Sequence, residues 1–285
     1  MKTVAPAKIN LFLEVKKKRS DGYHSIESIM QEISLFDTIM IFPAAKNITL
    51  SCSFPGLATD ASNLVVKAAM LLKKELKIDS GAKIVLDKRI PLGAGLGGGS
   101  SDAAATLRGL LQVWKRHMSY RKLVRLASRI GADVPFFIRG GTALARGIGD
   151  ILTPIKNVRK SFFVVVFPNV SIPTASVYRK LHFPLTNRRE SNKIKSLLEA
   201  SKRAREWETY IYNRLEEVVL PRYKTIFLVR KKIESLGYRS LMSGSGSAVF
   251  GIVPSRKEGE RVRRRLSSTR WKVWVVESFD SASKA

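Results

Sequence analysis

The segment that decides the fold reads Pro91-Leu-Gly-Ala-Gly-Leu-Gly-Gly-Gly-Ser-Ser101, with five glycines among the seven residues from Gly93 to Gly99. Glycine permits positive φ and lets backbone N–H groups converge on an anion. Alternation at 83–90 predicts a strand before the loop, and a helix is predicted from the loop to about Trp114, with its N-terminal dipole at the same point. The segment therefore predicts a phosphate cradle. A ligand-free turn is disfavoured, because five glycines cost folding entropy that a plain turn does not require.

Three common nucleotide-binding loops do not fit this segment. Residues 93–98 match GxGxxG, but the dinucleotide fold needs an acidic residue about 20 positions later. The stretch from Lys115 to Lys122 is basic instead. A Walker A loop needs Gly-Lys-Ser/Thr after the glycines. The HRD and DFG motifs of protein kinases are absent from the sequence.

The chain around the loop has an α+β pattern in two halves. The polar stretch 151–160 contains Pro154 and predicts a connection, so we expect domains at 1–154 and 155–285. Strands are predicted in the first half at 9–14, 26–35, 38–42, 48–53 and 83–90. Helices are predicted from residue 63 (with Ser62 as N-cap), from the glycine loop to about Trp114, and at 119–130. Strands are predicted in the second half at 162–167, 239–242, up to 253 and at 271–277, and helices at 174–181, 191–201, 206–219, 222–236 and 257–267.

The charge is strongly positive, with 51 Lys and Arg against 23 Asp and Glu, a formal net charge of +28. Such a balance favours anionic partners: nucleic acid, an anionic membrane surface or a phosphorylated substrate. The basic runs at 16–19, 230–232 and 263–265 are dispersed, which is typical of a solvated surface. No recognised nucleic-acid motif is present and aromatic residues are not interleaved with these runs, so nucleic acid is disfavoured as a partner.

The sequence predicts a cytoplasmic protein. Cys52 is the only cysteine, which excludes an internal disulfide and a cysteine-based zinc site. The longest purely apolar run, 162–167, is far shorter than the ~20 residues of a membrane span. No signal peptide is recognised at the N-terminus.

Six segments, in order along nearly the whole chain, resemble the GHMP kinases (galactokinase, homoserine kinase, mevalonate kinase and phosphomevalonate kinase). They are PAKIN at 6–10, DGYHSIESIMQ at 21–31, PLGAGLGGGSSDAA at 91–104, GADVPFF at 131–137, SIPTASVY at 171–178 and SGSGSAVF at 243–250. The resemblance implies a two-domain α+β fold, with an N-terminal domain like domain 2 of ribosomal protein S5, a ferredoxin-like C-terminal domain and a central cleft.

The resemblance also implies the activity, the ATP-dependent phosphorylation of a small alcohol with Mg²⁺. The DGYH and IPT elements are similar to those of the branch that acts on a cytidine diphosphate derivative of methylerythritol in the non-mevalonate isoprenoid pathway. Two alternatives remain: a GHMP kinase for homoserine or mevalonate, and a nucleic-acid-binding protein on a kinase fold. A monomer or weak homodimer is expected.

Two residues are candidates for catalysis. From the residues alone, Asp133 in its Gly-Ala-Asp-Val-Pro turn is more often a turn-forming aspartate, and Lys8 in a strand is more often solvated. The resemblance implies that Asp133 accepts the hydroxyl proton. It also implies that Lys8 keeps this carboxylate ionised and polarises the hydroxyl.

The resemblance further implies a substrate site. Tyr23 and Tyr178 match positions that stack on the cytosine, although Tyr178 stands where the family has phenylalanine. Asn10 and His24 match polar lining positions, and Thr174 is expected to cap the helix after Pro173 and to face the diphosphate. Without the resemblance, these residues would be ordinary turn, helix and core residues.

The nucleotide site implied by the resemblance centres on the glycine loop. The residues expected to hold the phosphates are Pro91, Leu92, Gly93, Ala94, Gly95, Leu96, Gly97, Gly98, Gly99, Ser100 and Ser101. Asn63, Lys88 and Asp102 are expected near the adenosine, and no metal ligand is assigned. Gly244 and Gly246 form either a plain hairpin turn or a loop that closes over the site, with equal support. His117 and His182 are interpreted as structural or surface residues.

Overall fold

The computed structural model describes residues 1–156, 158–181, 194, 196–197, 199, 207–267 and 270–281. Unit 1 comprises Met1–Ala7, Leu35–Pro91 and Gly97–Gly140, and unit 2 comprises Lys8–Ser34, Leu92–Leu96 and Gly141–Ala285. The units interleave along the chain because strands β1 (Lys2–Lys18) and β2 (His24–Ala44) each contribute residues to both. A single boundary near residue 155, as expected from the sequence, does not separate these compact units.

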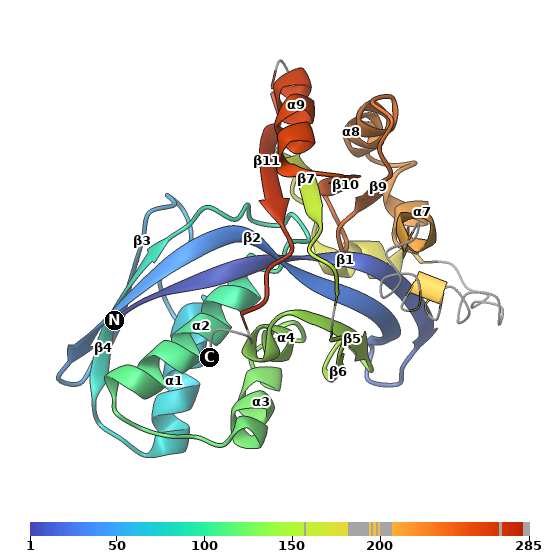
Figure 1. Cartoon of the computed structure of the whole chain (residues 1–285). Coiled ribbons are helices and arrows are strands. Elements are labelled where there is room, and N and C mark those ends of the chain that lie inside the picture. Colours follow the sequence, from blue (N-terminus) through green and yellow to red (C-terminus); the bar gives the residue numbers. More distant parts are fainter. Residues whose placement is uncertain are drawn as a thin grey trace. The chain divides into compact units, whose positions relative to one another are not determined.

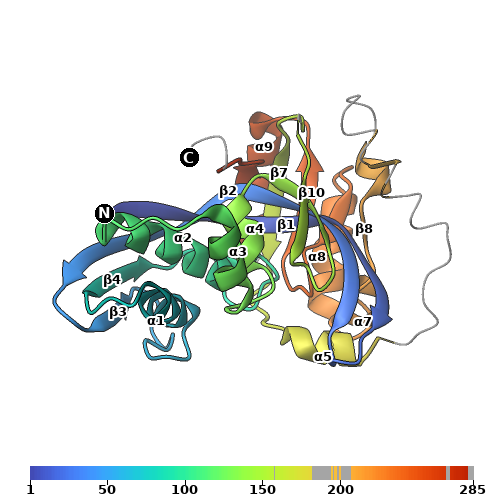
Figure 2. The same cartoon turned by 90° about the horizontal axis from the view of Figure 1, so that it is seen from below.

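Unit 1 is a sheet with helices packed on it. β4 (Gly81–Asp87) pairs antiparallel with the second half of β2 and parallel with β3 (Ile48–Cys52). Helices α1 (Leu64–Leu76) and α2 (Gly98–Val113) lie side by side, as Figure 2 shows. Trp114 Nε1 donates to the carbonyl of Gly81 at 3.0 Å, and Gly109 lies so close to Ile41 that a Cβ would meet it at 2.6 Å. α2 is therefore packed against β2 and β4.

Two shorter helices complete unit 1. α3 (Tyr120–Ser128) buries Leu123, Leu126 and Ala127 and exposes its other side. The Gly-Ala-Asp-Val-Pro turn leads directly into α4 (Val134–Arg139), which the sequence did not predict. Pro135 suits the first turn of a helix because its missing N–H has no partner to lose there. Asp133 is the residue before the helix.

Unit 2 contains a four-stranded antiparallel sheet in the order β11-β7-β10-β9. The order of elements is β7 (Phe162–Phe167), α8 (Lys224–Glu234), β9 (Ser240–Met242), β10 (Val249–Val253), α9 (Arg256–Leu266) and β11 (Lys272–Glu277). This βαββαβ order is ferredoxin-like, as expected. Both helices pack on the sheet, and Val229, Ile233, Val262 and Leu266 join its core (Figure 1).

Other strands of unit 2 pair with the second part of β1 and the first half of β2. β5 (Thr142–Arg146) pairs with β2 and with β6 (Ile151–Pro154), and β8 (Tyr212–Asn213) runs parallel to β1. The helix predicted at 206–219 is wrong. The chain forms a 3-10 turn η1 (Trp207–Tyr210), then β8, then α7 (Glu216–Val219). Pairing of Phe12 and Leu13 with β8 explains the interruption, since it draws residues 212–213 into a strand.

Three further sequence expectations have clear outcomes. The predicted helix at 174–181 is α5 (Thr174–Arg179). Most of the helix predicted at 191–201 lies outside the described residues, but the described residues 194, 196, 197 and 199 are helical. His182 also lies outside the described residues. The N-cap of α1 is Asn63, not Ser62, because Asn63 Oδ1 accepts from Val65 N at 2.9 Å. None of the helices in the described part of the chain has the length and hydropathy that a membrane crossing demands.

Candidate active site

Between residues 93 and 96, the backbone carbonyls of the glycine loop are hydrogen-bonded to the protein, whereas the backbone N–H groups donate to none of the described residues. Gly93, Gly95 and Gly97 have positive φ of 62°, 74° and 70°. Consecutive carbonyls from residue 93 to residue 96 each accept a hydrogen bond: from Ile172 N (3.3 Å), Ala248 N (3.0 Å), Ser243 Oγ (2.9 Å) and Lys8 N (2.9 Å). In the described structure, no backbone N–H from residue 93 to residue 97 donates to protein. Backbone amides left free in this way are suited to bind an anion.

Gly95 cannot carry a side chain, because a Cβ there would overlap the backbone carbonyl oxygen of Ser243. A Cβ at Gly93 would meet Ser171 Oγ, which can rotate away, but the φ of 62° still favours glycine. Gly99 differs, because a Cβ there would make only an ordinary contact of 3.6 Å with Leu64. The close approach of the Ser243 backbone to the loop therefore requires glycine at position 95.

The first turns of α2 carry polar side chains with unused oxygens. Gly97 is the N-cap of α2, and Ser101 and Asp102 are 1% and 2% exposed. Ser101 Oγ and Asp102 Oδ1 are buried without a hydrogen-bond partner among the described residues. Ser100 Oγ lies 3.9 Å from the point where a Cβ of Gly131 would be, so the loop that ends at Asp133 borders this helix start.

Two of the residues expected near the adenosine, Lys88 and Asp102, belong to a buried ion-pair triad. Lys88 Nζ pairs with Asp37 and, at 3.1 Å, with Asp102, and all three side chains are at most 2% exposed. Asp37 Oδ1 also accepts from Ile90 N at 2.8 Å. Burial raises the pKa of Asp102 to about 8, Asp37 adds to the rise and Lys88 opposes it. The ammonium of Lys88 is thus already paired with two carboxyl groups of the protein.

The remaining expected nucleotide residue, Asn63, has its side chain hydrogen-bonded to backbone at the start of α1. Asn63 Oδ1 caps the helix and Nδ2 donates to the carbonyl of Ala58 at 2.7 Å. Contact between Asn63 or Lys88 and a nucleotide stays a prediction.

Lys8 and Asn10 are brought together in unit 2. Lys8 is 4% exposed, so the solvated alternative is wrong, and its Nζ donates to Asn10 Oδ1 at 2.6 Å. Asn10 Nδ2 donates to Ser28 Oγ at 2.8 Å, which donates to the carbonyl of Phe12 at 2.6 Å. This chain of hydrogen bonds orients Asn10, so its oxygen faces the lysine. Sequence reasoning missed Ser28, although it lies within the segment 21–31.

The second glycine loop, residues 243–247, packs against the same two side chains. A Cβ at Gly244 would lie 3.3 Å from Asn10 Oδ1 and 3.4 Å from Lys8 Nζ. The loop joins β9 and β10, which pair as a hairpin, yet it also contacts the first glycine loop through Ser243 Oγ and Gly95 O. It therefore does more than close a hairpin, and its contact with ligand stays a prediction.

Two buried side chains that the sequence did not single out hold this loop. Asn213 Nδ2 donates to the carbonyls of Met242 (2.7 Å) and Gly244 (2.8 Å). Glu216 Oε1 accepts from Met242 N at 2.8 Å, while its Oε2 accepts from Arg230 at 2.7 Å. Burial raises the pKa of Glu216 above its ordinary value, and Arg230 opposes the rise. The only sequence signal was a polar pair inside an expected helix.

The residues expected to bind the base lie in unit 2. The rings of His24 and Tyr178 are 5.2 Å apart and tilted by 34°. Tyr23 is 59% exposed in the turn that precedes His24. Burial, with a smaller contribution from Lys18, lowers the pKa of His24 below its ordinary 6.5. A neutral imidazole beside an aromatic ring is suited to a flat polar base.

Thr174 does not cap α5. Pro173 occupies the N-cap position, and Thr174 Oγ1 instead forms a 2.8 Å hydrogen bond with Ser245 Oγ in the second glycine loop. That part of the prediction is wrong because Ser245, distant in sequence, competes for the hydroxyl.

Asp133 is half-buried in unit 1, and its side chain does not cap α4. Its place is set by Gly131, whose carbonyl accepts from Val134 N at 3.2 Å. The residues assigned to the site thus divide between the units. Asp133, Asn63, Lys88, Asp102, Pro91 and residues 97–101 belong to unit 1, and Lys8, Asn10, Tyr23, His24, Thr174, Tyr178 and residues 92–96 to unit 2.

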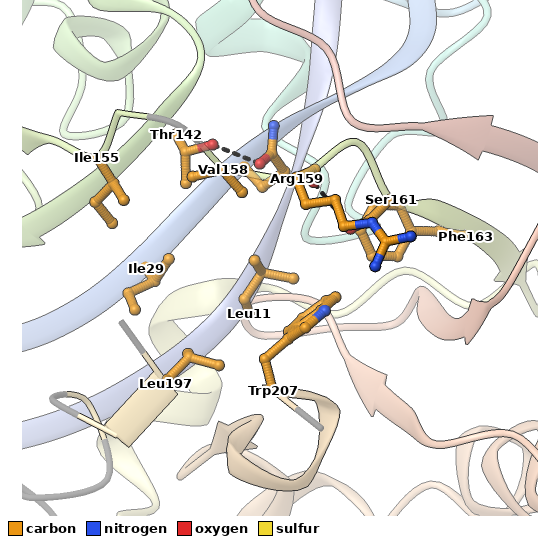
Figure 3. A pocket seen from close by; sticks show the side chains of 11 residues that line it. Leu11, Ile29, Thr142, Ile155, Val158, Arg159, Ser161, Phe163, Leu197 and Trp207 are labelled. Atoms are coloured by element: carbon orange, nitrogen blue, oxygen red, sulfur yellow. Dashed lines mark hydrogen bonds between the residues drawn. The ribbon is translucent and has the colours of Figure 1, made fainter. Parts of the chain in front are cut away.

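A pocket in unit 2 is separate from these residues (Figure 3). It has about 430 Å³ of empty space, part of it open to solvent, and its lining is mostly apolar, with Leu11, Ile29 and Trp207 around it. Leu11 and Ile29 directly follow Asn10 and Ser28, so strand alternation places them on the opposite face of β1 and β2. The pocket contains no residue that the sequence assigned to the site.

Comparison with known proteins identifies the family. The family model described as "GHMP kinases N terminal domain" matches residues 63–141, which include the glycine loop and Asp133. The description "GHMP kinases C terminal" matches residues 194–272, which include the second glycine loop. The two matches lie on opposite sides of residue 155, where the sequence predicts the domain boundary.

Relatives and solved structures agree with these matches. The chain is 40% identical to the 4-diphosphocytidyl-2-C-methyl-D-erythritol kinase of Alkaliphilus oremlandii, over 98% of this chain and 96% of that protein. It is 39% identical to the protein of the same name from Geobacillus thermodenitrificans, over 92% and 91%.

A crystal structure of 4-(cytidine 5'-diphospho)-2C-methyl-D-erythritol kinase superimposes with a TM-score of 0.83 at 35% identity, over 98% of this chain and all of that one. Homoserine kinase from Cytophaga hutchinsonii shares the fold, with a TM-score of 0.76 at 18% identity, over 98% and 94%. The chain therefore belongs to the GHMP kinase family.

Proposed function

We propose that this chain transfers the γ-phosphoryl group of ATP to the 2-hydroxyl of 4-diphosphocytidyl-2-C-methyl-D-erythritol. The name of its relatives at 36–40% identity over nearly the full length supports this activity. One observation carries the chemistry: the loop at 93–97 is held by four of its carbonyls while its amides stay available to an anion. Phosphoryl transfer depends mainly on such positioning and electrostatic stabilisation.

In this proposal, Lys8 and Asn10 serve the acceptor hydroxyl. A buried ammonium is unfavourable unless an anion or hydrogen-bond acceptors compensate it. Lys8 is buried, and its Nζ donates to the amide oxygen of Asn10 at 2.6 Å. In this role, the ammonium of Lys8 would favour the ionised carboxylate of Asp133 and the developing alkoxide, and Asp133 would accept the hydroxyl proton.

Mg²⁺ belongs to the proposal because phosphoryl transfer requires neutralisation of the phosphates. The described residues include no group of three or more His, Cys, Asp or Glu that could hold a metal. Mg²⁺ bound to phosphates needs only one or two protein oxygens. Ser101 Oγ and Asp102 Oδ1 are buried oxygens without a partner in the described structure, so they fit this requirement. Bound Mg²⁺ would supply charge neutralisation at the β- and γ-phosphates.

The other end of the substrate is assigned to His24, Tyr23 and Tyr178. The contact between the His24 and Tyr178 rings supports a cytosine site, because a base can stack on the tyrosine while the neutral imidazole forms a hydrogen bond. Thr174 lies four residues before Tyr178, and its hydroxyl is hydrogen-bonded to that of Ser245. We assign these two hydroxyls to the diphosphate. A cytoplasmic location and a monomer or weak homodimer stay predictions.

The test is a coupled ATPase assay with three alcohols: 4-diphosphocytidyl-2-C-methyl-D-erythritol, homoserine and mevalonate. We expect turnover with the cytidine compound at least about 10²-fold above the other two, because only it presents a base to the aromatic pair. Phosphorylation at the 2-hydroxyl is read from the product by NMR. Preferred turnover of homoserine or mevalonate would overturn the substrate assignment and leave the kinase assignment intact.

A further inference from the structure

A basic stretch in unit 1 is not used by the proposed reaction. Between Asp102 and Asp133 the sequence contains no acidic residue. The same interval contains seven basic residues, namely Arg108, Lys115, Arg116, Arg121, Lys122, Arg125 and Arg129. They accompany the end of α2, the connection after it and α3. From the sequence, the stretch from Lys115 to Lys122 is recognised as basic, but only the runs at 16–19, 230–232 and 263–265 are weighed there as binding surfaces.

Five of these cations are exposed and form no ion pair with another described residue: Lys115, Arg116, Arg121, Lys122 and Arg125. With the exposed His117 and Tyr120 they define what we call the α2–α3 surface. Helix α9 offers a contrast within the same chain. Its Arg256, Arg261 and Arg263 pair with Glu277, Glu258 and Glu260. The five exposed cations of the α2–α3 surface are thus not paired with acidic residues in the described part of the chain, whereas three of those on α9 are.

Helix stability explains only part of this charge. Lys115 and Arg116 follow the C-terminus of α2, where the helix dipole favours cations. Arg121 and Lys122 occupy the first turn of α3, which contains no acidic residue. The dipole disfavours cations at that end of a helix. A bound anion would offset the unfavourable placement.

The aromatic residues indicate which polyanion fits. Tyr120 is 51% exposed and lies next to Arg121 in the chain. Cations beside exposed aromatic rings are typical of surfaces that bind single-stranded nucleic acid, where phosphates pair with the cations and bases stack on the rings. A membrane is disfavoured, because the apolar residues of α3, Leu123, Leu126 and Ala127, are buried in the unit and cannot insert.

This surface is distinct from the phosphate cradle. α2 has 16 residues, so its ends are about 24 Å apart at ~1.5 Å per residue. The glycine loop meets the N-terminus of α2 and the basic surface begins after its C-terminus. Both therefore could be occupied at once.

We propose that the α2–α3 surface binds the phosphate backbone of single-stranded RNA, with Tyr120 stacking on a base. This goes beyond the kinase activity and gives the positive charge of this part of the chain a partner.

The test is fluorescence anisotropy with a labelled 20-nucleotide uridine RNA at 50–200 mM salt. The variant K115Q/R116Q/R121Q/K122Q/R125Q removes five charges, and R256Q/R261Q/R263Q/R264Q/R265Q removes the same number from α9. We expect the α2–α3 variant to bind the RNA at least tenfold more weakly at 100 mM salt. The slope of its log binding constant against log salt concentration should be smaller in magnitude by about 3.5, because five phosphate contacts are lost. We expect less than threefold weakening for the second, and about fivefold for Tyr120→Ala.

ATP turnover of the α2–α3 variant is the folding control and should equal that of the wild type. Equal weakening by the two five-site variants would overturn the proposal, since binding would then follow net charge alone. So would undetectable binding of the RNA by the wild type at 100 mM salt. Tighter binding to a duplex of the same length, or to vesicles with 30% phosphatidylserine, would assign the surface to another partner.

Discussion

The side chain of Asn213 donates a 2.8 Å hydrogen bond to the backbone carbonyl of Gly244, the glycine that lies beside Lys8 and Asn10. Its second amide hydrogen goes to Met242, and its Oδ1 accepts from Leu215 N at 2.9 Å. All three hydrogen bonds are buried, so the residue ties β8 to the second glycine loop. Asn213→Asp keeps the shape and the acceptor but turns a carboxylate oxygen toward two carbonyls.

We expect Asn213→Asp to lower kcat by about tenfold or more, because the loop is displaced from Lys8. Lower pH should partly restore kcat in this variant alone, since the protonated carboxyl regains one donor. Steady-state kinetics at pH 5.5–8 measures both. Asn169→Asp is the control, because Asn169 also donates to a backbone carbonyl but is exposed. Wild-type kcat in Asn213→Asp at all pH values would contradict the expectation.

Glu216 should make stability depend on pH. Its pKa is raised above the ordinary 4.5 in the folded state, so the folded protein binds the proton more tightly than the unfolded chain. The resulting stabilisation is present below pH 4.5 and is lost as pH rises through the raised pKa. Glu216→Gln removes this titration. The Tm of the wild type minus that of Glu216→Gln should therefore fall between pH 4 and pH 8, measured by thermal unfolding. A difference that stays level or grows would refute this.

Gly95 and Gly99 should respond differently to alanine. A Cβ at Gly95 overlaps the Ser243 carbonyl and requires a φ of +74°, whereas one at Gly99 lies at contact distance in the first turn of α2. Gly95→Ala should cost about 2 kcal/mol or more of stability. Gly99→Ala should leave stability unchanged or raise it by up to ~1 kcal/mol, because alanine favours a helix. Urea unfolding compares the two, and equal losses would show that the predicted overlap is relieved by movement of the loop.

Lys8 and Asp133 should be essential for turnover and dispensable for folding. Lys8→Met replaces a buried ammonium by an apolar chain of similar length, and we expect kcat to fall by about 10²-fold or more. Asp133→Asn should lower kcat by about 10²–10⁴-fold, as for loss of a general base. Lys17→Met is the control in the same strand, because Lys17 is exposed. Either variant with near wild-type kcat would remove that residue from the mechanism.

Tyr178 and His24 should determine affinity for the cytidine end. Tyr178→Ala should raise KM for the cytidine substrate about tenfold and leave KM for ATP unchanged, while Tyr178→Phe keeps the ring and the affinity. The pKa of His24 is lowered below 6.5, so the imidazole is neutral at pH 7 and gains a proton only when the pH falls below 6.5. KM of the wild type should therefore rise as pH falls toward 5, and His24→Asn should lack this rise. An unchanged KM in Tyr178→Ala would support a smaller alcohol as substrate.

Much of the site could be predicted from the sequence because its signals are local. The glycine loop needs positive φ at three positions, which only glycine adopts readily, so the pattern itself indicates an anion site. Lys8 and Asn10 are two residues apart in one strand, so their side chains share a face and meet. Periodicity also predicted the strands and helices that form the second sheet, and the resemblance to the GHMP kinases implied their ferredoxin-like order.

The parts that failed depend on residues far apart in the chain. The helix expected at 206–219 is interrupted by β8, because residues 212 and 213 pair with Phe12 and Leu13 of β1. Thr174 was expected to cap a helix, but Ser245, 71 residues away, takes its hydroxyl. Asn213 and Glu216 could not be distinguished from ordinary helical polar residues, because their partners at Met242 and Gly244 are at least 26 residues away.

By itself the sequence determined the positive-φ glycine loop and the order of most strands and helices, since steric freedom and hydrophobic periodicity act between near neighbours, and its six motifs indicated the family. Only the tertiary structure decided that Lys8 is buried, that Lys88 is paired with Asp37 and Asp102, and that the compact units interleave. Burial and ion pairing depend on which distant segments exclude water from a side chain, and no local pattern specifies that.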